Sequence, residues 1–183
     1  MNNKNIAILL IASKTLDLIS TYLVDKTLST ETSIWVSRFN FGWSGFILVN
    51  IIFVLFLVFF LQKVNKNTKV VEELEKNKTF NSFKEYFNYI LLESNTNKSF
   101  IYKLLFQKIR LSIFTYFFIY ALSYSIITMS FIVSLSNFMI YFDIYDLSHL
   151  EDDFLGLLLF IMNIFCLIYF FTKHIYRRYL RFN

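Results

Sequence analysis

Residues 44–62 read SGFILVNIIFVLFLVFFLQ, and this stretch decides the fold because it is almost wholly apolar and carries no charge. A helix needs about 20 apolar residues to cross about 30 Å of hydrocarbon at about 1.5 Å per residue. The stretch meets that requirement and predicts a membrane-spanning helix. Three further long apolar blocks lie at 6–24, 111–142 and 154–172. The sequence therefore predicts a multi-span membrane protein.

The four blocks predict an all-α integral membrane bundle. We expect one membrane domain over residues 1–183, with spans at about 6–24, 44–62, 111–135 and 153–172. A hydrophobic content of 56% and a mean hydropathy of +0.52 leave little chain for a separate soluble domain. Gly occurs 3 times and Pro is absent, whereas Phe occurs 24 times and Tyr 12 times. We therefore expect the helices to pack through bulky aromatic side chains and not through small-residue faces.

The charges of the connecting segments predict the orientation. Residues 63–110 and the C-terminal tail are rich in Lys and Arg, whereas residues 143–153 are acidic and contain neither. Basic segments stay on the cytoplasmic side of a bacterial inner membrane, or on the matrix side of an organellar inner membrane. Four spans with both termini on that side satisfy every connection. A hairpin within residues 111–142 would move the C-terminus outside, so we expect one long tilted helix there.

The middle segment contains two further helical pieces. Apolar residues from Phe80 to Leu91 recur on one face of residues 79–94, which predicts an amphipathic helix in the headgroup region or against a partner. The preceding stretch VVEELEKNK, residues 70–78, has mixed charge and is expected to be a solvated helix.

Five polar residues within the apolar blocks are the candidate site. Lys14 and Asp17 lie one turn apart in the first span, and each charge alone would cost about 2.5–3.5 kcal/mol in a membrane helix. Asn50, Asn137 and Asn163 occupy the other three blocks and are expected to face the bundle interior, because a buried amide must find a partner. We favour an interhelical polar clamp. A proton or ion relay, or a substrate-contacting pair, is the alternative.

Basic and aromatic residues alternate in the tail KHIYRRYLRFN. Lys173, Arg177, Arg178 and Arg181 are expected to contact anionic lipid or a partner protein. Binding to nucleic acid is not expected, because the basic residues gather at span ends as topology signals.

The first span also carries an Asp-x-x-Ser/Thr-Thr pattern, in the stretch KTLDLISTYLV of residues 14–24. This stretch resembles the first span of small uncharacterised bacterial polytopic membrane proteins, over about the first fifth of the chain. It is also similar to the Asp-bearing first span of lipoprotein signal peptidases. The paired catalytic aspartates of that family lie in later spans, and the third and fourth blocks here contain no internal Asp, so we reject that activity.

No motif for catalysis is present. The sequence contains no HExxH, no GxSxG and no glycine-rich phosphate loop, and Cys166 is its lone cysteine. We expect no enzyme activity, no catalytic residue, no metal and no cofactor. The leading hypothesis is an accessory or structural subunit that contacts other membrane subunits or itself in a larger complex. The alternative is a small transporter or ion or proton conductor that uses Lys14 and Asp17.

Overall fold

The structure, a computed structural model, describes residues 3–28, 42–64, 66–76, 78–92, 109–144 and 152–182. Six helices make up the described chain, and it contains no strand. They are α1 (Asn3–Val24), α3 (Trp43–Val64), α4 (Asn67–Glu75), α5 (Phe83–Leu91), α7 (Leu111–Tyr141) and α8 (Asp152–Phe182). Four of them, α1, α3, α7 and most of α8, are long and apolar enough to cross a membrane. The prediction of an all-α bundle is confirmed, and the chain is a multi-pass membrane protein.

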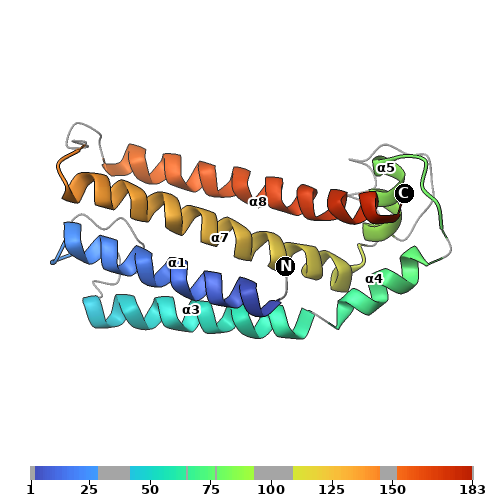
Figure 1. The fold of residues 1–183 in the computed structure, drawn as a ribbon, viewed down its shortest axis with the longest axis horizontal. Helices are drawn as coiled ribbons and strands as arrows, with labels where there is room; N and C mark the ends of the chain where they lie inside the picture. The colour runs from blue at the N-terminus through green and yellow to red at the C-terminus, as the bar shows by residue number, and fades with distance from the viewer. Residues whose placement is uncertain are drawn as a thin grey trace.

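Helices α1 and α7 run in the same direction and in fixed register. Tyr120 Oη donates a hydrogen bond to Asn3 Oδ1, and Asn137 Nδ2 donates one to Ser20 Oγ, and in both pairs the residues are 117 apart in sequence. Figure 1 shows α3 and α8 running the opposite way. Both ends of the chain therefore lie toward the same end of the bundle, the C-terminus beside α5 and the N-terminus nearer the middle of the long axis.

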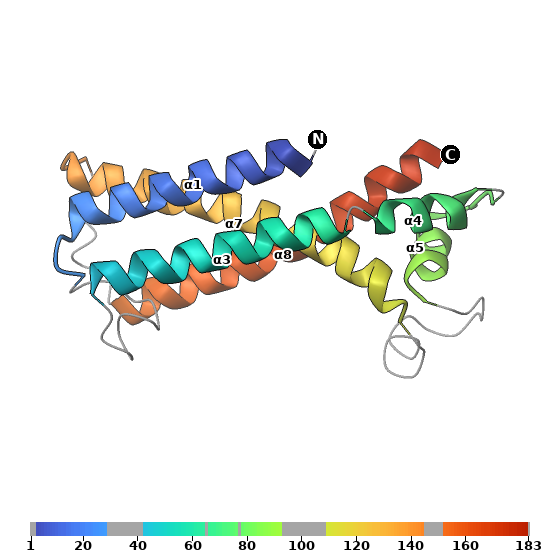
Figure 2. The same ribbon diagram turned by 90° about the horizontal axis from the view of Figure 1, so that it is seen from below.

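The four spans form a trough. Figure 1 shows them in the order α8, α7, α1 and α3. Figure 2, turned by 90°, shows α3 and α8 on one side of α1 and α7 in the half that holds the C-terminal ends of α1 and α7. In that half α1 and α7 form a floor with α3 and α8 as two walls, and a cavity lined by residues of all four helices lies there, so we call this arrangement the trough.

Buried serines pack the contact between α1 and α7. Ser13 and Ser20 of α1 are fully buried. Ser130 and Ser134 of α7 are only 2% and 1% exposed. The shared register places Ser13 level with Ser130, and small side chains at such positions let two backbones approach closely. The expectation that packing relies on aromatic residues is therefore wrong for this pair of helices, because serine supplies the small face that glycine does not.

Aromatic packing holds for the contact between α7 and α8. Phe171 meets Phe114 and Phe117, with ring centroids 5.5 Å and 6.3 Å apart. Tyr124 stacks on Phe170 at 5.5 Å. These ring pairs lie along one side of α7, so α7 presents serines to α1 and rings to α8.

Helices α7 and α8 are longer than a single membrane crossing requires. Each has 31 residues and is uninterrupted. At about 1.5 Å per residue each measures roughly 46 Å, against about 30 Å of hydrocarbon. The α8 helix continues to Phe182, past the predicted span end at residue 172, because no Gly or Pro follows Gly156.

The first of the two short helices departs from the prediction. We expected residues 70–78 to be solvated, but α4 buries Val71 and Glu75, which are 0% and 1% exposed. The reason is that α4 packs on α7 and that Glu75 has a basic partner on α8.

Helix α5 lies within the predicted amphipathic segment, 79–94, of which residues 93–94 are outside the described chain. It begins where the side chain of Ser82 accepts a hydrogen bond of 3.2 Å from the backbone N–H of Glu85, and the Glu85 carboxylate accepts one of 3.0 Å from the backbone N–H of Asn81. Tyr86, Ile90 and Leu91 are buried against α7 and α8. The apolar face of α5 therefore covers two spans of its own chain.

Candidate functional site

The two charged residues of the first span form an ion pair. Lys14 Nζ lies 2.7 Å from Asp17 Oδ2, across one turn of α1. The two side chains are 20% and 16% exposed. Because the two charges cancel, the pair enters the membrane interior without a net charge, which lowers the cost that either residue alone would carry.

The ion pair borders a cavity of about 460 Å³ in the trough. All four spans line this cavity. Its polar wall consists of Lys14, Asp17, Thr21 and Asn50. The apolar wall consists of Leu18 on α1, of Phe46, Val49 and Phe53 on α3, of Val133 on α7 and of Leu159 on α8.

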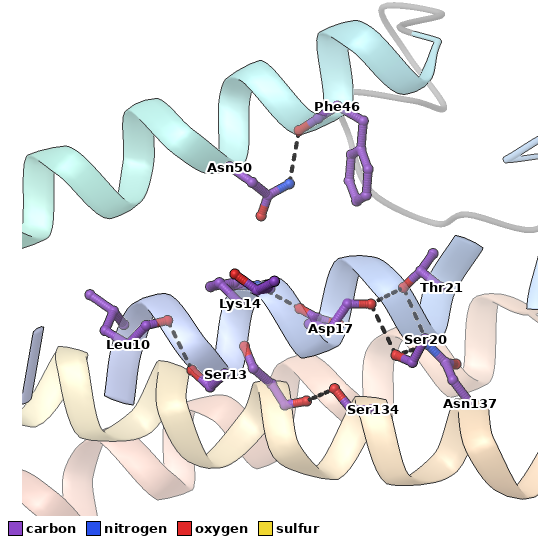
Figure 3. A network of polar contacts seen from close by, with 12 residues as sticks. Leu10, Ser13, Lys14, Asp17, Ser20, Thr21, Phe46, Asn50, Ser134 and Asn137 are labelled. Carbon is purple, nitrogen blue, oxygen red and sulfur yellow. Dashed lines mark hydrogen bonds and ion pairs between the residues drawn. The ribbon is translucent and has the colours of Figure 1, made fainter. Parts of the chain in front are cut away.

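Asn50 faces the ion pair across the cavity. Its Nδ2 donates a 2.9 Å hydrogen bond to the carbonyl oxygen of Phe46, one turn earlier on α3. Figure 3 shows the amide pointing from α3 toward the helix that carries Lys14 and Asp17. Asn50 therefore belongs to the site, but it does not fasten α3 to another helix.

Asn137 fastens α7 to the turn that carries Asp17. Its Nδ2 donates to the hydroxyls of Ser20 and Thr21, at 3.2 Å each. Both hydroxyls donate in turn to the carbonyl oxygen of Asp17, at 2.9 Å and 2.8 Å (Figure 3). Asn137 therefore joins α7 to α1 through the hydroxyls beside Asp17, and not through the side chains of Lys14 and Asp17.

Asn163 lies away from the cavity. Its Oδ1 accepts a 2.7 Å hydrogen bond from Ser125 Oγ, and this contact joins α7 to α8. The structure thus separates the predicted residues: Asn50 shares the cavity with the ion pair, whereas Asn137 and Asn163 join neighbouring helices.

The basic residues of the tail also divide. Arg177 and Arg181 are exposed, and Lys173 Nζ donates a 2.7 Å hydrogen bond to the Tyr169 hydroxyl one turn earlier. Arg178 departs from the interpretation as a lipid contact, because its side chain is buried and meets a carboxylate of its own chain.

Sequence reasoning missed a buried ion pair between α4 and α8. Arg178 Nη2 donates to Glu75 Oε2 at 3.0 Å, and Arg178 Nε donates to Glu75 Oε1 at 3.2 Å. Tyr86 Oη donates to the same Oε1 at 2.5 Å, and Arg178 Nη1 donates to Tyr116 Oη at 3.2 Å. These four residues come from α4, α5, α7 and α8. Nothing in the sequence pairs residue 75 with residue 178; only the spacing of Val71 and Glu75 places the carboxylate on an apolar face.

Burial raises the pKa of the Tyr86 phenol above its usual range, and the hydrogen bond to Glu75 raises the pKa further. An unfolded Tyr has a pKa of about 10. Because the folded pKa is the higher one, the phenol stabilises the fold fully below pH of about 10, and this contribution is lost as the pH rises further.

The free energy of unfolding of the wild type, minus that of Tyr86→Phe, is expected to stay constant from neutral pH up to about pH 9.5 and to shrink above about pH 10. Thermal unfolding in a mild detergent, followed by circular dichroism, measures this difference. A difference that shrinks already between pH 7 and pH 9 contradicts the assignment.

No group of three His, Cys, Asp or Glu side chains able to hold a metal ion occurs among the residues that the structure describes. Comparisons with protein-family models, curated proteins and solved structures give no match.

Proposed function

We propose that the chain is a non-catalytic subunit of a larger membrane complex. The observation that carries this proposal is the trough, because α3 packs only lightly on α1 and α7 and, within the described chain, polar groups remain beside a cavity at the base of the bundle. A bundle that served no partner would be expected to close over an intramembrane ion pair, since polar groups in lipid need partners.

The surfaces of the two walls support this proposal. In α8 only 6% of the span is buried, and in α3 17%, against 56% in α7. Aromatic and aliphatic residues dominate the exposed surface of both helices. Phe56 and Phe59 on α3, and Phe160 and Phe165 on α8, are each more than half exposed. These surfaces are suited to packing against further helices, as well as against lipid.

The test is affinity purification of the tagged chain in a gentle detergent, followed by mass spectrometry, with a photo-crosslinking residue at Phe165. We expect a constant set of co-purifying membrane proteins that crosslink from position 165. The control places the crosslinker at Phe117, which is fully buried, and should give no crosslink to a partner. A chain that purifies alone in several detergents, with no crosslink at 165, contradicts the proposal.

The ion pair in its cavity favours a second candidate, a small transporter or an ion or proton conductor. One observation argues against this second candidate. Buried apolar residues, among them Ile6, Leu10 and Leu57, lie between the cavity and the end of the bundle at which the chain begins. The replacement of both charges, Lys14→Leu with Asp17→Leu, separates the candidates. If the double variant keeps its partners but loses a flux that the wild type shows in vesicles, transport is favoured. If the double variant loses its partners, and neither it nor the wild type shows a flux, the role as a subunit is favoured.

We further propose that the end of the bundle with both termini faces the cytoplasm or the organellar matrix. Basic side chains exposed at this end favour that side and contact with anionic lipid. They are Lys63, Lys66, Lys69, Lys76, Lys78, Lys84, Arg177 and Arg181.

A labelling experiment tests this orientation. In a Cys166→Ser background, Asp143→Cys is expected to react with an impermeant thiol reagent added to intact cells, and Thr79→Cys only after lysis. Both positions are exposed, at opposite ends of the bundle. Reaction at position 79 in intact cells reverses the orientation.

A further inference from the structure

We propose that one transmembrane helix of a partner protein binds in the trough, and that this helix presents an uncharged hydrogen-bonding side chain to Lys14, Asp17 and Asn50. This inference rests on the proposed function as a subunit. It adds where the partner binds and which chemistry it carries.

The depth of the polar groups excludes a lipid headgroup as their natural partner. Lys14 lies near the middle of the 22 residues of α1, about 15 Å from either end of the helix. Headgroups lie at the membrane surface, and acyl chains carry no hydrogen-bonding group at this depth. A side chain of a membrane-spanning helix does reach it.

The charges of the site determine the kind of side chain. The Lys14–Asp17 pair has no net charge, so a charged partner residue would leave an uncompensated charge in the membrane interior. Hydrogen-bonding capacity nevertheless remains. Lys14 has further N–H groups, and within the described chain the Asn50 side chain bonds only through its nitrogen, which leaves Oδ1 to accept. An Asn, Gln, Ser or Thr can both donate and accept here.

The shape of the site suits the side chains of a helix. The cavity of about 460 Å³ lies between α3 and α8, whose lining residues are apolar apart from Asn50. Phe46, Val49 and Phe53 follow one face of α3, with Leu159 of α8 opposite. A helix lying along the open side of the trough can place one polar and several apolar side chains against these walls.

The test uses synthetic helices of about 20 Leu and Ala residues, each with a terminal dansyl group and one central guest residue: Leu, Asn, Glu or Lys. Each peptide is mixed with the full chain in lipid vesicles, and binding is measured by energy transfer from tryptophan. The Asn peptide is expected to bind about three- to thirtyfold more tightly than the Leu peptide. A peptide with Asn near one end controls for depth and should bind like the Leu peptide.

Two charge variants sharpen the test. With Asp17→Asn the site keeps only the Lys14 charge, and the Glu peptide should become the preferred one. With Lys14→Met the site keeps only the Asp17 charge, and the preference should pass to the Lys peptide. Leu159→Phe, which narrows the trough without adding a tryptophan, should weaken binding of the Asn peptide, whereas Leu158→Phe on an exposed face of α8 should not.

Equal binding of the Asn and Leu peptides to the wild-type chain overturns the inference. This comparison uses the wild-type chain alone, so it does not depend on whether a variant folds. A photo-crosslinker at Leu159 that captures only phospholipid, or only a second copy of this chain, overturns it as well. In either case partners that co-purify and crosslink from position 165 would leave the proposed function standing, so the two failures are distinguishable.

Discussion

Replacing Glu75 by Gln is expected to lower the free energy of unfolding by about 3–5 kcal/mol, because the change leaves the buried Arg178 guanidinium without its counter-ion. The carboxylate is 1% exposed and accepts three hydrogen bonds, two from Arg178 and one from Tyr86. Unfolding in mixed detergent and SDS micelles, followed by circular dichroism, measures the loss.

A double-mutant cycle separates the pair from its surroundings. Glu75→Gln combined with Arg178→Met removes both charges, so the double variant is expected to be more stable than Glu75→Gln alone. Glu72→Gln is the matched control: this neighbouring carboxylate is 58% exposed and 4.0 Å from Arg178, so its loss should cost less than about 1 kcal/mol. Equal losses for Glu72→Gln and Glu75→Gln contradict the buried pair.

Replacing Ser13 by Leu is expected to lower the free energy of unfolding by about 1–3 kcal/mol, because a larger side chain does not fit the closely packed contact between α1 and α7. Ser13 is fully buried and level with Ser130. The separation of the two helices should also weaken the bonds of Asn137 to α1, which lie further along the same contact.

Thr15→Leu is the matched control for Ser13→Leu. Thr15 lies two residues along α1, is exposed, and bonds only to the carbonyl oxygen of Ile11 in its own helix. The stability is expected to change by less than about 0.5 kcal/mol. The same detergent unfolding experiment compares the two variants, and equal effects would mean that serine size plays no part in this contact.

Local patterns in the sequence were sufficient to predict the spans. Apolar length located all four of them, and the charge argument against a hairpin in residues 111–142 agrees with the uninterrupted α7. The short helices were harder to predict. Apolar spacing located α5, but the burial of α4 depends on Arg178, which lies 103 residues further along the chain.

The candidate site was predictable only in part, for a similar reason. The spacing of Lys14 and Asp17 within one helix makes their contact a local property, and the pair is formed. Which Asn faces the pair depends on how α3, α7 and α8 are rotated against α1, and no local pattern encodes that rotation. Hence Asn50 shares the cavity, while Asn137 and Asn163 serve other contacts.

The parallel pairing of α1 with α7 has a consequence for biosynthesis. Residues that meet across this contact are 117 positions apart, so α1 leaves the ribosome long before its main packing partner. At about 5–20 residues per second the delay is roughly 6–23 s. During that time the serines, Lys14 and Asp17 have no α7 to pack against. The early chain is therefore expected to stay beside the insertion machinery, or a membrane chaperone, until the third span arrives.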